Sequence, residues 1–239
     1  MKTKMMLISV CVMLAVLLSA CGTMAPAAQP PVRALNVSGM GQVTTKPDVA
    51  YINIGVHTEK PTASEATTQN NADAAAVIKA IKAAGIADED IKTTNFNIYQ
   101  QTTNDPTTGV KTSSFYAVDN TVLVTVRDLT KLGNVLDASV KAGANTVNSI
   151  QFDLFDKTKA LSEARAKAVK AARAEADELA SAAGVTLGNI QSINSTENTP
   201  GPIYYAKNAG GFAAADASVP VSAGTMDISV SVSLTYEIK

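Results

Sequence analysis

The chain has 239 residues, of which 20 are lysine or arginine and 21 are aspartate or glutamate, so its formal net charge is −1. This balance excludes a protein that binds nucleic acid through a basic surface, because such binding depends on neutralising phosphates. One histidine and two cysteines are too few ligands for a zinc site, and we expect no metal and no other cofactor.

The chain begins with an apolar segment. Lys2 and Lys4 precede it, and residues 5–18 carry no charged side chain. A basic start followed by a short apolar run predicts a secretory signal peptide over residues 1–20. The run is short for a transmembrane helix, which needs about 20 apolar residues. We therefore expect the chain to be exported.

Cys21 is the candidate lipidation site. The sequence Leu18-Ser19-Ala20-Cys21 resembles the lipobox of bacterial lipoproteins, which implies cleavage between Ala20 and Cys21 and attachment of lipid to the Cys21 thiol. Cys11 lies within the signal peptide and would be lost, which leaves Cys21 without a disulfide partner. Cleavage at another position, with Cys21 unmodified or removed, stays open as the alternative.

A lipid on Cys21 would hold the protein on a membrane, since two or three acyl chains anchor a protein firmly. Gly22 favours the outer membrane, because an aspartate at that position would resemble an inner-membrane retention signal. Residues 21–33 are rich in proline and alanine, which predicts an extended, lipidated tether.

The remaining residues, 34–239, are expected to form one domain. Residues 35–44 and 51–57 each alternate apolar with polar side chains, which predicts two strands joined by a tight turn around Pro47. Gly39 and Gly41 lie within the first strand. There they indicate a bulge or the close approach of another backbone, and not a phosphate-binding loop.

Three helices are predicted, and an Ala-Gly pair ends each of them. The first begins at a capping box formed by Thr62 and Glu65 and ends at Gly85. The second is capped by Asp128, ends at Gly143 and is expected to bury Leu129, Leu132, Val135, Leu136 and Val140. The third is the longest, from about residue 158 to residue 183, and its inner face is expected to carry Leu161, Ala164, Ala168, Ala172 and Leu179.

Further strands are predicted between and after the helices. Residues 91–101 and 117–126 read as a hairpin turned by residues 105–109, and residues 147–155 as another strand. Residues 197–222 are rich in small and polar side chains and predict a mobile surface loop. Residues 228–236 alternate strictly between apolar and polar side chains, which predicts a strand with one buried face. The pattern as a whole predicts an α+β fold, a mostly antiparallel sheet built from β-hairpins with about three helices packed on it.

A set of blocks from about Ala34 to Ile238 resembles the SIMPL-domain family of bacterial envelope proteins. The blocks are VSGMGQVTTKPDVAYINIGVHTE, AAGIADEDIKTTNFNIY, VRDLTKLGNVLD, EARAKAVKAARAEADELASAAGVTLGNI and SAGTMDISVSVSLTYEI. The resemblance implies a periplasmic α+β domain associated with defence against oxidative stress. It also implies immunogenicity in some pathogens and, in some members, ring-like or channel-like homo-oligomers. It carries over no catalytic residues, and the lipobox departs from many members.

No catalytic set is expected from the residues themselves. His57 is the single histidine and is predicted on the solvent-facing side of a strand, although a periplasmic hydrolase that uses His57 stays open as the alternative. No G-x-S-x-G motif supports that alternative. The acidic run Asp88-Glu89-Asp90 lacks the ligand spacing of a calcium loop and predicts a turn.

The sequence thus predicts a lipid-anchored binding or scaffolding protein on the periplasmic side of the cell envelope. We expect a homo-oligomer, a membrane contact through the lipid on Cys21, an envelope protein partner that the sequence does not identify, and no nucleic acid. Any contribution to oxidative or envelope stress defence would be indirect, because the lipid would consume the only thiol of the mature chain.

Overall fold

A computed structural model describes residues 33–104, 107–109, 111–198 and 221–239. Along the chain the elements are β1 (Ala34–Thr45), β2 (Val49–Lys60), α2 (Ala63–Ala83), η1 (Asp88–Asp90), β3 (Ile91–Asn104), β4 (Lys111–Val126), η2 (Leu129–Lys131), α3 (Leu132–Lys141), β5 (Thr146–Asp153), α4 (Thr158–Ala183), β6 (Leu187–Asn198) and β7 (Met226–Ile238). The predicted α+β class and antiparallel pairing are confirmed.

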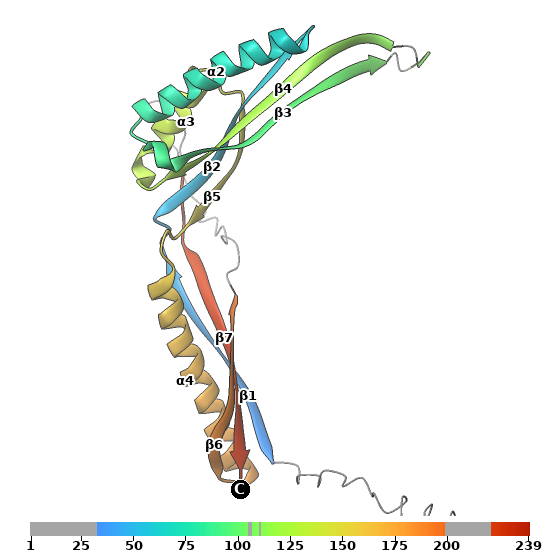
Figure 1. Cartoon of the computed structure of the whole chain (residues 1–239). Coiled ribbons are helices and arrows are strands. Elements are labelled where there is room, and N and C mark those ends of the chain that lie inside the picture. The colour runs from blue at the N-terminus through green and yellow to red at the C-terminus, as the bar shows by residue number, and fades with distance from the viewer. Residues whose placement is uncertain (1–32, 105–106, 110, 199–220) are drawn as a thin grey trace, which may run out of the picture.

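The strands form two separate sheets, which lie one beyond the other in an elongated molecule (Figure 1). The four-stranded sheet has the order β3-β4-β2-β5, and the three-stranded sheet has the order β1-β7-β6. The strands on either side of Pro47 do not pair with each other, because β1 pairs with β7 while β2 pairs with β4 and β5. Alternation shows which face of a strand is buried and says nothing about its neighbour, so the sequence did not separate the two sheets.

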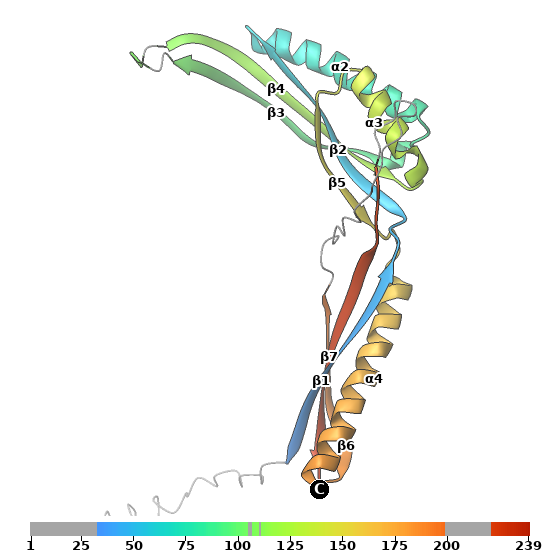
Figure 2. The same ribbon diagram turned by 180° about the vertical axis from the view of Figure 1, so that it is seen from behind.

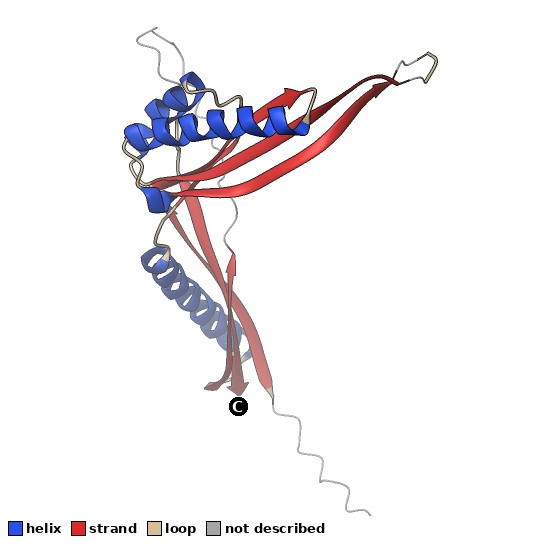
Figure 3. Ribbon diagram, turned by 45° about the horizontal axis from the view of Figure 1, so that its top comes forward, coloured by secondary structure: helices blue, strands red, loops and turns tan. Residues whose placement is uncertain are grey.

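Helices α2 and α3 cover one face of the four-stranded sheet and leave the other face open (Figure 3). The capping box of α2 is confirmed, since the Glu65 N–H donates to Thr62 Oγ1 at 3.2 Å. The expected burial of Val140 on α3 is wrong, because Val140 is 57% exposed. Ser139 is buried in its place, and its hydroxyl donates to the Val135 carbonyl at 2.6 Å. The 3₁₀ turn η2, which tightens the first residues of this helical segment, shifts the phase of its apolar side.

Helix α4 packs on one face of the three-stranded sheet, beside β1 and β7 (Figure 2). Its buried residues are alanines at every fourth position, namely Ala160, Ala164, Ala168, Ala172, Ala176 and Ala180. A Cβ atom on Gly39 would overlap backbone atoms of Ala168 and Ala172, and one on Gly41 would overlap those of Ala164 and Ala168. The predicted close backbone approach is confirmed. The expected inner position of Leu179 is wrong, since it is 42% exposed.

Each helix ends at the predicted glycine in a left-handed conformation, with φ of 93° at Gly85, 113° at Gly143 and 67° at Gly184. The residue after each glycine donates its N–H to the carbonyl five residues earlier. The Ala144 bond to Ser139 and the Val185 bond to Ala180 both measure 3.0 Å. This is the hydrogen bond of a Schellman motif, so the same helix stop is used three times.

The loop predicted over residues 197–222 has different bounds in the structure, because β6 continues to Asn198 and β7 begins at Met226. Residues 199–220 lie outside the described residues, as do the signal peptide, Ala20, Cys21 and the tether up to residue 32. Val221 and Ala223, which precede β7, pack against the core of the four-stranded sheet. The described residues just before β7 therefore contact the four-stranded sheet, although β7 itself belongs to the three-stranded sheet.

Candidate functional site

His57 lies on the open face of the four-stranded sheet, because it alternates along β2 with buried Val56 and Thr58. Its two ring nitrogens both face carboxylates. Nδ1 is 2.6 Å from Asp119 Oδ1 on the neighbouring strand β4, and Nε2 is 3.2 Å from Glu59 Oε1 on β2. His57 and Asp119 are direct partners in the β2–β4 register, and this places the two side chains together.

Asn145, which follows Gly143 at the end of α3, holds the backbone of the same histidine. Its side-chain oxygen accepts from the His57 N–H at 2.8 Å, and its side-chain amide donates to the His57 carbonyl at 2.7 Å. The amide thus takes the place of one more β5 residue, since the β2–β5 pairing ends at Gly55 and Thr146. Both the ring and the backbone of His57 are fixed.

The two carboxylates stabilise the charged imidazolium. The hydrogen bond to Asp119 raises the pKa of His57 most, the bond to Glu59 raises it further, and partial burial opposes both. Partial burial, together with the nearby Asp119 carboxylate, also raises the pKa of Tyr99, which faces the same side from β3. A general base needs a free lone pair on a ring nitrogen. This arrangement engages both nitrogens, so it suits holding a charge better than moving a proton.

Asn70 is a fully buried polar residue of α2 that no motif in the sequence indicated. Its amide nitrogen lies 2.9 Å from the Val56 carbonyl and 3.1 Å from the Val118 carbonyl, so it bonds both β2 and β4. Its side-chain oxygen has no hydrogen-bond partner among the described residues. We interpret Asn70 as the residue that fixes the position of α2 over the sheet.

The acidic run Asp88-Glu89-Asp90 forms the turn η1, as predicted. Asp90 is bound by the Arg127 guanidinium, with Nε–Oδ2 of 2.9 Å and Nη2–Oδ1 of 2.8 Å. The guanidinium also lies over the Phe155 ring, 4.0 Å from its centroid. These contacts join the end of β4 to the connection between β5 and α4, where the two sheets meet. Within the described ranges, no group of three or more histidine, cysteine or acidic side chains is placed to hold a metal ion.

Strand β3 forms an edge of the four-stranded sheet, and its hairpin with β4 extends past the helices (Figure 3). The pairing runs without a bulge from Asn95 to Thr103, and this stretch contains no charged residue and no proline. Three of its side chains are large and exposed: Phe96 at 48%, Ile98 at 42% and Tyr99 at 37%. An edge of this kind is open to pairing with another strand.

The other edges each carry a feature that limits pairing with another strand. Side chains of α4 reach the backbone of β1, because the Ser38 N–H donates to Glu175 Oε2 and the Gln42 carbonyl accepts from Lys167 Nζ. Edge strand β5 carries a bulge at Ser149, where φ is 45°. Edge strand β6 has two register shifts near its start and the charged Glu197 near its end, paired with Arg165.

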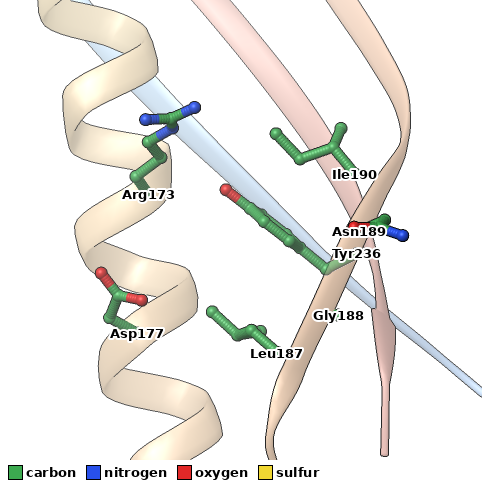
Figure 4. A pocket seen from close by; sticks show the side chains of 7 residues that line it. All are labelled: Arg173, Asp177, Leu187, Gly188, Asn189, Ile190 and Tyr236. Atoms are coloured by element: carbon green, nitrogen blue, oxygen red, sulfur yellow. The ribbon is translucent and has the colours of Figure 1, made fainter.

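A groove of about 610 Å³ lies between α4 and the strands β6 and β7, at the end of the three-stranded sheet (Figure 4). The helix contributes Arg173 and Asp177, β6 contributes Leu187 and Ile190, and β7 contributes Tyr236. Tyr236 is only 7% exposed, and its hydroxyl points toward the helix. Tyr236 is the last residue of the alternating stretch 228–236, and this alternation gives no sign of a groove.

No helix within the described ranges combines the length and apolar character that crossing a bilayer requires.

Comparison with known proteins places the chain among envelope proteins. A family model named SIMPL, described as a protein of unknown function (DUF541), matches residues 35–236. The 26 kDa periplasmic immunogenic protein of Brucella melitensis is 37% identical over 211 residues, which cover 85% of this chain and 84% of the relative. The uncharacterized protein YggE of Escherichia coli (strain K12) is 31% identical over 156 residues, which cover 65% of this chain and 63% of the relative.

Proposed function

The chain belongs to the SIMPL family, and we propose that it is a lipid-anchored scaffolding protein of the bacterial envelope that assembles with copies of itself. The open edge of β3 is the observation that carries this proposal. The location on the periplasmic side is supported by the signal segment of this chain and by the name of the Brucella relative.

The second copy is the partner that best fits the β3 edge. Asn95 to Thr103 offers nine residues of unpaired backbone on its outer side, and exposed Phe96 and Ile98 lie beside it on the face that carries α2. A strand from another copy would bond this backbone and cover the two side chains. Pairing of identical edges gives a two-fold dimer, whereas pairing with a different edge gives a ring or an open chain.

The self-assembly is tested by charging this edge. A Phe96→Lys, Ile98→Lys variant places two cations where two copies would meet, so we expect its molar mass to fall while its folding is retained. Light scattering after size-exclusion chromatography measures the mass, on chains that also carry Cys21→Ala so that no lipid contributes. Val140→Lys is the matched control, because it charges an equally exposed apolar residue on α3. A monomeric parent chain, or equal masses for all three proteins, would contradict the proposal.

The alternative of a hydrolase that uses His57 is not favoured by the geometry, since carboxylates face both ring nitrogens. A His57→Ala variant that keeps its fold and loses a measured hydrolytic activity would establish the alternative. We further propose that any role in oxidative or envelope stress is indirect, because both cysteines lie at or before position 21 and the folded domain has no thiol.

A further inference from the structure

The groove between α4 and β6–β7 is lined by a largely buried tyrosine whose hydroxyl has no partner in the described part of the chain. Tyr236 is 7% exposed, yet its hydroxyl makes no hydrogen bond to any residue of the described part of the chain. The hydroxyl of a tyrosine with a buried ring usually lies at a hydrogen-bond partner or at water, and here it is not among the buried side-chain atoms that lack a partner. The hydroxyl points into the groove (Figure 4), so a molecule bound there could accept its hydrogen bond in place of water.

Two opposite charges face the same groove from α4. Arg173 and Asp177 are four residues apart, one turn of the helix, and neither forms an ion pair with the other or with another described residue. Their order along the helix explains this, since a basic residue placed before an acidic one at this spacing pairs less well than the reverse. Both charges remain available to a ligand.

Packing keeps the groove open. On the β1 side, Gly39 and Gly41 let α4 approach to backbone contact. On the β6 side, the strand shifts register twice, between Leu187 and Ile190 and between Ile190 and Ser192. The half-buried side chains of Leu187 and Ile190 form the apolar wall opposite Arg173 and Asp177 (Figure 4).

From this geometry we propose that the groove binds a small zwitterion with an apolar substituent, of which an apolar α-amino acid is the simplest. The guanidinium of Arg173 and the hydroxyl of Tyr236 both donate to its carboxylate. The carboxylate of Asp177 accepts from its ammonium, and Leu187 and Ile190 contact its side chain. This site shares no residue with the Cys21 anchor or with the β3 edge.

The test measures binding of L-leucine by isothermal titration calorimetry to the full chain carrying Cys21→Ala. We expect saturable binding at micromolar to low millimolar concentrations. Tyr236→Phe keeps the ring and removes the hydroxyl, and should weaken binding about tenfold, which corresponds to about 1.4 kcal/mol. Arg173→Gln should weaken it at least as much. Arg165→Gln, on the same helix but paired with Glu197 away from the groove, is the control and should bind as the parent does.

Two further compounds test the contribution of each charged group of the ligand to binding. 4-Methylpentanoate lacks the ammonium and 3-methylbutylamine lacks the carboxylate, so both should bind at least tenfold more weakly than leucine. Asp177→Asn should weaken leucine and leave 4-methylpentanoate unchanged. Absence of saturable binding, or equal affinity of Tyr236→Phe and the parent, would overturn the site. Equal affinity for leucine and 4-methylpentanoate would contradict the proposal that the ligand is a zwitterion.

Discussion

His57 is the residue at which pairing across strands creates a feature that the sequence does not display. Asp119 is far from it along the chain, and the two side chains meet only because β2 and β4 pair in this register. Sequence alternation placed His57 on an open face, which is confirmed. Alternation could not predict that Asp119 and Asn145 contact His57, because both contacts depend on which strands are neighbours.

The two carboxylates beside His57 lead to a prediction about its pKa. Because the two carboxylates raise its pKa above the ordinary 6.5, the histidine should titrate with a midpoint above that value. As the chain has one histidine, a single imidazole signal in a pH titration by NMR reports it. Asp119→Asn should lower the midpoint more than Glu59→Gln does, since the Asp119 bond is the larger cause. A midpoint at or below 6.5, or the opposite ranking of the two variants, would contradict this.

The same shift fixes the direction of the stability effect. A group whose pKa is higher in the folded state stabilises that state below its unfolded pKa, and the effect is lost as the pH rises through the folded value. His57→Gln should therefore destabilise the protein most between about pH 5 and 6.5, where the carboxylates are still ionised. At alkaline pH the variant and parent should unfold at nearly equal urea concentrations.

At the scale of elements, the close packing between α4 and β1 was indicated by the sequence. The sequence has two glycines in β1 and many alanines in α4. In the structure these glycines and alanines lie against one another. The position of the buried face was only partly predictable. A stripe of alanines at every fourth residue drifts around the helix, so Leu179 turns outward while Ala176 and Ala180 are buried.

Gly41→Ala tests this contact. The new methyl group would overlap the backbone of Ala164 and Ala168, which flexible side chains cannot relieve. We expect the free energy of unfolding to fall by about 3 kcal/mol, the upper end of the range for overpacking. Urea denaturation measures the change. Met40→Ala, at a neighbouring position on β1 that is 65% exposed, should change the stability by less than about 0.5 kcal/mol. Similar losses in both variants would show that the close approach is not the cause.

At the scale of the whole molecule, the class of the fold and the three helix stops followed from local patterns. The division into two sheets did not, because it is decided by pairing between distant segments such as β1 and β7. The groove was hidden for a related reason. Tyr236 fits the apolar alternation of β7, and only the packing of α4 against β6 and β7 shows that it lines a groove.

The anchor is predicted to depend on one sulfur. Cys21→Ala should move the protein from the membrane fraction to the soluble periplasmic fraction, because no thiol remains for the lipid. Cys11→Ala is the matched control, since that cysteine lies within the signal segment, and it should leave the protein membrane-bound. Mass spectrometry of the parent chain should find a mature N-terminus at Cys21 that carries lipid. Membrane retention of Cys21→Ala would contradict the prediction.

The antiparallel pairing of β1 with β7 places the beginning of the domain beside its C-terminus, with Ala34 opposite Glu237 (Figure 1). The twelve residues of β1 then climb roughly 40 Å before the four-stranded sheet begins. For a copy anchored at Cys21, the tether would join the domain at the end of the three-stranded sheet, and the four-stranded sheet with the β3 edge would lie at the other end of the molecule. Copies anchored in one leaflet would meet by diffusing within the plane of the membrane, which would favour pairing of their β3 edges over pairing in free solution.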